Sequence, residues 1–163
     1  MRIKAGLGYD IHKLEKGRKL FLGGVEIDFP EGLRGHSDGD CLIHAIIDAL
    51  LGALGEKDIG QTFPDTDPRY KDIRSSELLR KVIGKIKKKN MEILSIDSII
   101  IVEKPKLAPY VPQMKKVLCP ILGVGRDDLG IKAKTNEGLN AIGQGAAIAS
   151  WAQVLVREKE KAP

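Results

Sequence analysis

The sequence predicts a single α+β domain in which a mixed β-sheet is covered on one face by helices. Its 163 residues match the length of one domain. The patterned segments come in the order hairpin, two helices, strand, helix, strand and final segment, which is typical of this fold class. The run 41–54 is apolar on nearly every side, so we expect a helix that is enclosed by protein.

The first part of the chain predicts strands followed by a loop. Residues 2–14 and 19–27 read as strands, and a pair of glycines at 23–24 signals a hairpin in the second range. Residues 28–40 are rich in Gly, Asp and Pro and predict a loop that leads into the apolar helix.

Three polar residues stand out against that helix. Asp40, His44 and Asp48 are spaced four residues apart, which places them along one helical stripe in apolar surroundings. Buried charges need partners, so the stripe either faces a polar site or is hydrogen-bonded within the protein.

The middle of the chain predicts a functional loop and a second helix. Residues 55–74 hold two prolines and four aspartates, and loops of this length in compact domains tend to be functional. We expect Ser75 or Ser76 to cap a helix that runs to about Lys89. Its predicted buried stripe is Leu78, Leu79, Val82, Ile83 and Ile86.

The last third predicts three more regular elements and a final segment. Residues 91–104 form a strand that prolines close, 112–122 a short helix, and 129–135 a further strand. A glycine-bearing loop at 136–145 leads to 146–158, which we expect to be a strand although its alanines also suit a helix.

The composition favours an ordinary globular protein of the cytoplasm. No run approaches the about 18 apolar residues of a membrane span, and no signal-peptide core is seen near the first residue. Cys41 and Cys119 form no paired motif, which predicts reduced thiols. Much of the positive charge behind the net value of +5 lies in 87–89 and in 157–163, and we expect a charged tail at 158–163 beyond a domain at 1–157. With few aromatic residues, we expect no nucleic-acid partner, and none in a membrane.

The strand at 2–14 carries the first candidate for chemistry. Asp10 and His12 share one face, and we expect Tyr9 and Ile11 on the other face to anchor the strand to the core. Together with His44 they form a set of two histidines and one carboxylate, the composition of a zinc or iron site with an open position. The alternative is that each histidine is a hydrogen-bonded structural residue.

The second candidate lies in 132–145. Thr135, Asn136 and Glu137 follow a strand and precede a glycine-bearing turn, where backbone N–H groups can hold an anion and a carboxylate can hold a divalent cation. The pattern also fits a plain glycine turn between strands. Lys104 and Lys106, in a proline-rich loop, can serve a phosphate or simply face solvent.

Six stretches of the chain carry a more specific pattern: GYDIHKL, GGVEI, GHSDGDCLIHAIIDALLGAL, DIGQTFPDTDP, EKPKLAPY and KAKTNEGL. In this order they resemble the 2-C-methyl-D-erythritol 2,4-cyclodiphosphate synthase family, from Arg2 to about Arg157. The resemblance implies a homotrimer with active sites between neighbouring subunits. It also implies cyclisation of 4-diphosphocytidyl-2-C-methyl-D-erythritol 2-phosphate with release of CMP, a step of non-mevalonate isoprenoid biosynthesis.

The resemblance further implies two metal sites and the residues around the substrate. Asp10, His12 and His44 match zinc ligands, and Glu137 matches a ligand of a second ion, magnesium or manganese. His36 and Thr135 match residues that stabilise the transition state. The other matched substrate positions are Ser37, Asp58, Ile59, Gly60, Phe63, Pro64, Asp65, Thr66 and Asp67, then Val102, Pro105, Lys106, Leu107, Ala108, Lys134 and Asn136.

The sequence departs from the family at Ala141 and Gln144, where Phe and Arg are common. Gln144 lacks the charge that would hold an isoprenoid diphosphate in the trimer's central channel. Two other functions fit parts of the sequence. A metal-dependent hydrolase of a nucleoside diphosphate ester would use water as the attacking group. A basic module that binds nucleic acid would leave the stripe of Asp40, His44 and Asp48 without a role.

Overall fold

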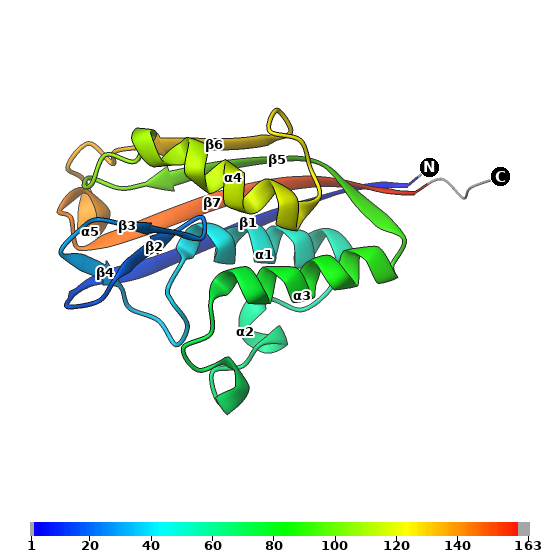
Figure 1. The fold of residues 1–163 in the computed structure, drawn as a ribbon, viewed down its shortest axis with the longest axis horizontal. Helices are drawn as coiled ribbons and strands as arrows, with labels where there is room; N and C mark the ends of the chain where they lie inside the picture. The colour runs from blue at the N-terminus through cyan, green and yellow to red at the C-terminus, as the bar shows by residue number, and fades with distance from the viewer. Residues whose placement is uncertain (1, 160–163) are drawn as a thin grey trace.

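The computed structural model describes residues 2–159 and contains one main sheet with helices packed on one face (Figure 1). The five strands lie in the order β4-β1-β7-β5-β6, and β2 and β3 form a separate two-stranded sheet. In chain order the elements are β1 (Ile3–Lys16), β2 (Leu20–Leu22), β3 (Val25–Ile27), β4 (Glu31–Leu33), α1 (Cys41–Leu54), α2 (Ile59–Thr62), the 3-10 helix η1 (Pro68–Tyr70), α3 (Ser75–Lys88), β5 (Met91–Ile101), the 3-10 helix η2 (Ala108–Tyr110), α4 (Val111–Leu122), β6 (Leu129–Lys134), α5 (Asn140–Gly143) and β7 (Ala147–Glu158).

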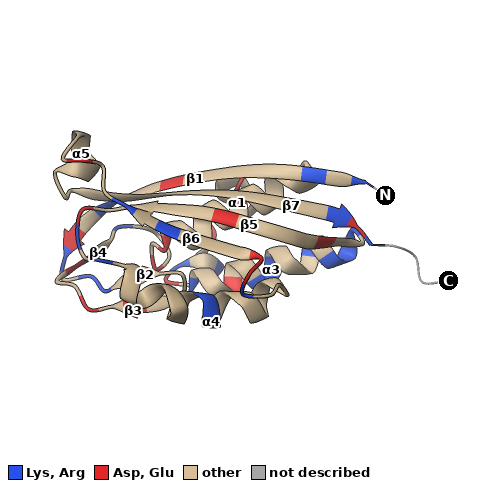
Figure 2. Cartoon of the chain, turned by 90° about the horizontal axis from the view of Figure 1, so that it is seen from above, with Lys and Arg blue, Asp and Glu red and all other residues tan. Residues whose placement is uncertain are grey.

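The sheet is mixed, as the sequence predicts. Strands β5 and β6 are parallel, whereas β1 pairs antiparallel with β4 and with β7, and β5 pairs antiparallel with β7. The final segment is a strand that runs beside β1 over nearly its whole length, with Tyr9 opposite Trp151. Figure 2 shows α1, α3 and α4 on one face of the sheet. The prediction of an α+β domain with helices on one face is therefore confirmed.

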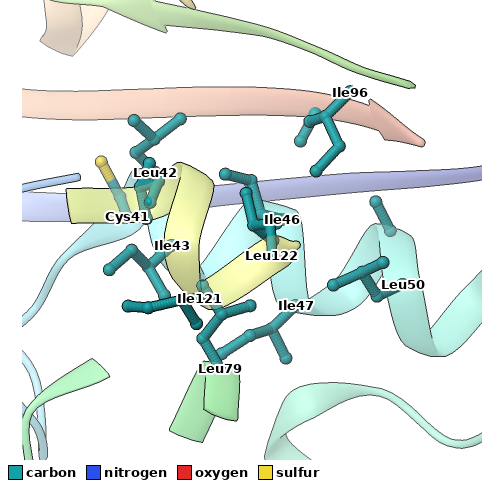
Figure 3. Close-up of a cluster of buried hydrophobic side chains, with 14 of the residues drawn as sticks. Cys41, Leu42, Ile43, Ile46, Ile47, Leu50, Leu79, Ile96, Ile121 and Leu122 are labelled. Atoms are coloured by element: carbon teal, nitrogen blue, oxygen red, sulfur yellow. The ribbon is translucent and has the colours of Figure 1, made fainter. Parts of the chain in front are cut away.

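Helix α1 forms the centre of the core. Its residues are buried except Asp48 and Gly52, and the sheet, α3 and α4 enclose it within a single chain. Figure 3 shows Leu42, Ile46 and Leu50 of α1 among side chains from the sheet and the neighbouring helices. The apolar residues on all sides of α1 are therefore explained by burial within one domain.

Two glycines bring α1 unusually close to β1. A Cβ atom on Gly8 would lie 1.9 Å from the Ala45 oxygen, and one on Gly6 would lie 1.9 Å from the Ala49 oxygen. These glycines share a strand face with Asp10, and α1 presents alanines to them. Small residues on both elements therefore let the two backbones touch.

The face of β1 that carries the apolar side chains is the exposed one, so the prediction that Tyr9 and Ile11 anchor the strand to the core is wrong. Tyr9 is 43% exposed and Ile11 is 42% exposed, and both lie on the face away from α1, because they alternate with Gly8, which packs against that helix. Tyr9 packs on Trp151 with a ring-centroid distance of 4.6 Å. The exposed large apolar residues of this sheet face, named here the outer apolar face, are Ile3, Leu7, Tyr9, Ile11 and Trp151.

Several short elements lie inside the predicted loops. Strand β4 falls within 28–40, α2 and η1 fall within 55–74, and α5 falls within 136–145. Each has three or four residues, too short for a hydrophobic period to reveal, and is held by contacts with other parts of the chain. The hairpin β2-β3 and the buried stripe of α3 are as predicted.

Helix α3 starts at Ser75, so neither Ser75 nor Ser76 caps it. Arg74 occupies the N-cap position and makes no side-chain cap hydrogen bond. Asp38, from the preceding loop, accepts from the Ser75 N–H instead, with an N···O distance of 3.1 Å. A side chain that is distant in sequence therefore provides the cap.

The remaining differences concern the ends of elements. Strand β5 ends at Ile101, three residues before the predicted end, and β1 extends two residues beyond 14. Strand β7 includes Glu158, the first residue of the predicted tail, and residues 160–163 lie outside the described part. None of the helices between residues 2 and 159 has both the length and the hydropathy that crossing a bilayer requires.

Candidate metal centre and active site

Three potential metal ligands converge where β1 meets α1. The nearest carboxylate oxygen of Asp10 lies 2.7 Å from His12 Nε2 and 3.0 Å from His44 Nδ1. The two imidazole nitrogens are 3.2 Å apart. Asp10 and His12 alternate onto the inner face of β1, and the close approach of α1 at Gly8 brings His44 within reach. This confirms that the sequence pattern places the three side chains together.

The chemistry of this donor set fits a transition-metal ion. One nitrogen from each histidine and one carboxylate oxygen lie within 4.8 Å of one another, which matches three protein ligands with a further position open. His12 Nδ1 donates to the Arg34 carbonyl over 2.5 Å, so in the neutral imidazole the lone pair is on Nε2, the nitrogen beside Asp10, where a metal ion can take it. Such a second hydrogen bond is what fixes the tautomer of a ligating histidine.

The ionisation of Asp10 suits the same role. Burial disfavours its charge, but in the metal-free protein hydrogen bonds and attraction from the protonated forms of His12 and His44 outweigh burial and hold the pKa of Asp10 at about 2. Burial likewise opposes charge on His12, whereas its hydrogen bond and attraction to Asp10 raise the pKa of this imidazole above its ordinary value. The carboxylate is therefore deprotonated near neutral pH, as a metal ligand must be.

The three ligands form the floor of a cavity of about 250 Å³. The predicted residues that line it are Asp10, His12, His36, Ser37, His44, Ile59, Gly60, Phe63 and Asp65. His36 Nε2 is buried and makes no hydrogen bond within the described residues, which is unusual for a buried polar atom and fits a site that is completed by a bound molecule. Gly35, Tyr70 and Leu78 also line the cavity and were not predicted.

The wall opposite β1 is built by α2 and η1. Asp48 of α1 accepts from the Ile59 N–H over 2.7 Å, and Asp58 caps α2 by accepting from the Gln61 N–H over 2.8 Å. Asp67 caps η1 and pairs with Arg69 at 2.6 Å. Asp58 and Asp67 thus shape the wall from outside the cavity lining, whereas Pro64 and Thr66 are exposed and do not line the cavity.

The polar stripe on α1 divides among three roles. Asp40 is fully buried and accepts from the N–H groups of Gly23, Gly24 and Ile43, which joins the hairpin to the start of α1. His44 faces the cavity, and Asp48 holds α2. Both alternatives for the stripe are therefore realised, at different positions.

The second predicted group lies at the far edge of the sheet. The Thr135 hydroxyl donates to Glu137 over 2.8 Å, and Glu103, which was not predicted, accepts from the Asn136 N–H over 2.7 Å. Strand β6, which ends at Lys134, is three strands away from β1, about 14 Å at ordinary strand spacing. In the part of the chain that the structure describes, residues 134–137 do not line the cavity that holds Asp10, His12 and His44.

The loop at 102–108 accompanies this second group. The Val102 N–H donates to the Lys134 carbonyl over 2.9 Å, which ties the loop to the end of β6. Val102 and Leu107 are buried, so their side chains belong to the core and only their backbone can meet a ligand. Lys106, Ala108 and Lys134 are exposed, and Pro105 is half-buried.

Comparison with known proteins agrees with the geometry. A protein from Caldicellulosiruptor bescii named 2-C-methyl-D-erythritol 2,4-cyclodiphosphate synthase is 50% identical over 95% of this chain and 99% of its own length. A protein of the same name from Clostridium acetobutylicum is 52% identical over 94% of this chain and 99% of its own length. The solved structure described as "IspF (Plasmodium falciparum) CDP complex" superposes with a TM-score of 0.85 at 36% identity, covering 97% of each chain. The model of the YgbB family matches residues 3–157, and the chain belongs to this family.

Proposed function

We propose that this chain is a 2-C-methyl-D-erythritol 2,4-cyclodiphosphate synthase, a cyclising phosphorus–oxygen lyase of non-mevalonate isoprenoid biosynthesis. The observation that carries the proposal is the convergence of Asp10, His12 and His44 in one cavity, in a chain about half identical to proteins of that name. Both cysteines are free and buried, which agrees with work in the reducing cytoplasm.

The reaction joins two groups of one substrate, so the protein needs no nucleophile of its own. An oxygen of the 2-phosphate forms a bond to the β-phosphorus of 4-diphosphocytidyl-2-C-methyl-D-erythritol 2-phosphate. The bond from that phosphorus to the bridging oxygen breaks, and CMP leaves with the oxygen. What the chain must supply is a folded substrate conformation and compensation for phosphate charge.

The residues divide between these tasks. Asp10, His12 and His44 would hold zinc, and Glu137 would hold magnesium or manganese; bound ions of this kind supply Lewis-acid polarisation of phosphate oxygens. His36, whose Nε2 has no partner in the described chain, and the Thr135 hydroxyl are suited to donate to phosphate oxygens as charge develops.

The substrate itself would lie between the two groups of residues. Ile59, Gly60 and Phe63 line the cavity and would enclose the methylerythritol part. The backbone of 102–108 and the segment 134–137 would hold cytidine and diphosphate.

We further propose that one active site uses two chains of a homotrimer. The separation of about 14 Å across the sheet between β1 and β6 keeps the two predicted groups apart within one chain. The outer apolar face, with Leu7 65% exposed, is the kind of surface that a subunit interface covers. A neighbouring chain that presents 134–137 to the cavity would complete the site.

Product analysis tests the reaction. The purified protein is expected to release CMP only with divalent metal, and ³¹P NMR should show a cyclic diphosphate. Asp10→Asn should lose bound zinc and turnover. Asp97→Asn, which removes an exposed ion pair between Asp97 and Lys132, should keep both. Full activity after exhaustive chelation contradicts the proposal, and an open monoester product would identify the hydrolase instead.

Mixed trimers test the shared site. If Asp10→Asn and Glu137→Gln chains are co-refolded in equal amounts, random association leaves about one quarter of the interfaces with both intact halves. Activity should then recover to about one quarter of wild type, although each variant alone is inactive. A site built within one chain would give no recovery.

A further inference from the structure

Behind His44, on the side away from Asp10 and His12, two polar residues continue a series of hydrogen bonds. Ser75 Oγ lies 2.8 Å from His44 Nε2, and the same hydroxyl donates to a carboxylate oxygen of Asp38. Ser75 is fully buried, and the Asp38 side chain is 6% exposed. Neither residue lines the cavity, so a contact with substrate does not explain them.

Counting hydrogens shows which group donates and which accepts in each of these hydrogen bonds. A carboxylate has no hydrogen to give, so the single hydroxyl hydrogen of Ser75 is used on Asp38. Ser75 must then accept from His44, which places the imidazole hydrogen on Nε2. Nδ1 of His44 keeps its lone pair, and this is the atom 3.0 Å from Asp10.

Asp38 is itself held from several directions. It accepts from the Ser75 N–H over 3.1 Å at the start of α3, where the helix dipole favours an anion. Arg74 lies 3.4 Å from the same carboxylate and stacks over the Phe21 ring at 3.9 Å. The Asp40 N–H approaches within 3.3 Å. Asp38 is therefore a fixed acceptor whose orientation does not depend on Ser75 alone.

Ser37 provides the competing arrangement. Its hydroxyl lies 3.2 Å from His44 Nε2 and 3.5 Å from Ser75 Oγ. If Ser37 donated to Nε2, the hydrogen of His44 would sit on Nδ1 and point at Asp10, as in a purely structural histidine. The shorter contact with Ser75 and the fixed acceptor behind it favour the first arrangement.

We propose that Asp38 and Ser75 are positioning residues that fix the Nε2–H tautomer of His44 and thereby set the metal affinity of the site. This inference rests on the proposed metal site and adds residues outside it. Partners of this kind behind a ligating histidine typically change metal affinity by about 10- to 100-fold when removed. A series of contacts thus links the hairpin to the metal centre, through Phe21, Arg74, Asp38, Ser75 and His44 in turn.

The experiment compares Ser75→Ala with Ser76→Ala, the same substitution one residue along α3. Zinc affinity is measured by chelator competition, and the tautomer of His44 by long-range ¹H–¹⁵N NMR of the zinc-free protein. Ser75→Ala is expected to lower zinc affinity by about 10- to 100-fold and to give a mixture of tautomers. At saturating zinc the KM for substrate should stay unchanged. Ser76→Ala should match the wild type in every measurement.

Asp38→Asn is the second variant to test if Ser75→Ala does not fold. We expect it to fold because Asn has nearly the same shape as Asp. The amide no longer demands the Ser75 hydrogen, so the Nδ1–H tautomer should increase and zinc affinity should fall by about 10-fold. Wild-type zinc affinity and a single Nε2–H tautomer in both variants would overturn the inference. Zinc-independent CMP release by the wild type would overturn the proposed function instead, so the two failures are distinguishable.

Discussion

The close contact between β1 and α1 makes Gly8→Ala the most informative single change. The added Cβ would lie 1.9 Å from the Ala45 oxygen and 2.7 Å from the Ala49 nitrogen. Ordinary contact starts near 3.4 Å, so the strand and the helix would have to separate by about 1.5 Å. Both obstacles are backbone atoms, which no side-chain rotation can move away. We therefore expect the cost to reach at least the upper end of the usual range for overpacking, about 3 kcal/mol.

The same displacement should damage the metal site. Metal–ligand distances tolerate deviations of about 0.2 Å, far less than the separation of about 1.5 Å, and His44 neighbours Ala45 on the displaced helix. Gly52→Ala is the matched control, because it lies in the same helix and its nearest obstacle is the Leu7 oxygen at 3.9 Å. Its better helix propensity should make it neutral or more stable by up to about 1 kcal/mol.

Urea unfolding at one fixed protein concentration, followed by circular dichroism, measures the cost. With an m-value of about 2 kcal/mol/M, 3 kcal/mol appears as a midpoint lowered by about 1.5 M. Mass spectrometry of bound zinc in the same samples reports the site. A Gly8→Ala protein with a wild-type midpoint and full zinc occupancy would refute this account of how β1 and α1 build the centre.

Three further changes address the cavity wall, the core and the outer face. Asp48→Ala leaves the Ile59 N–H without its acceptor, so it should lower the free energy of unfolding by about 1–2 kcal/mol and raise KM. Asp48→Asn keeps an acceptor and is the control, so equal kinetics for the two variants would contradict the role given to Asp48. Asp40→Ala removes the acceptor of three backbone N–H groups and should cost about 2–4 kcal/mol in calorimetry, so an unchanged melting temperature would count against it. Leu7→Glu should leave the far-UV spectrum intact but yield monomers in sedimentation, and a persistent trimer would argue against an interface on that face.

Long patterned segments were predictable from the sequence, because burial imposes a period on many residues at once. The apolar run of α1, the stripe of α3 and the strand β7 all emerge with bounds within a few residues. The short elements α2 and α5 did not, since four residues carry no period and other parts of the chain hold them in place. Ser75 was misassigned as a cap for the same reason: its acceptor, Asp38, is 37 residues away.

The orientation of β1 shows what the alternation of side chains along a strand does not predict. Alternation separates Tyr9 and Ile11 from Asp10 and His12, but it does not say which set meets the helices. The usable signal was the pair Gly6 and Gly8 on the polar face, because a helix can approach a strand closely only over small residues.

The sequence by itself determined the fold class, the family and the three candidate metal ligands, since each depends on residue types in a fixed order along the chain. Tertiary structure alone decided how these parts meet. It placed Asp38 and Ser75 behind His44 and the outer apolar face toward solvent. It also put β6, which leads to Glu137, about 14 Å across the sheet from β1. Distances between residues remote in sequence are set by how whole elements pack, and no local pattern encodes them.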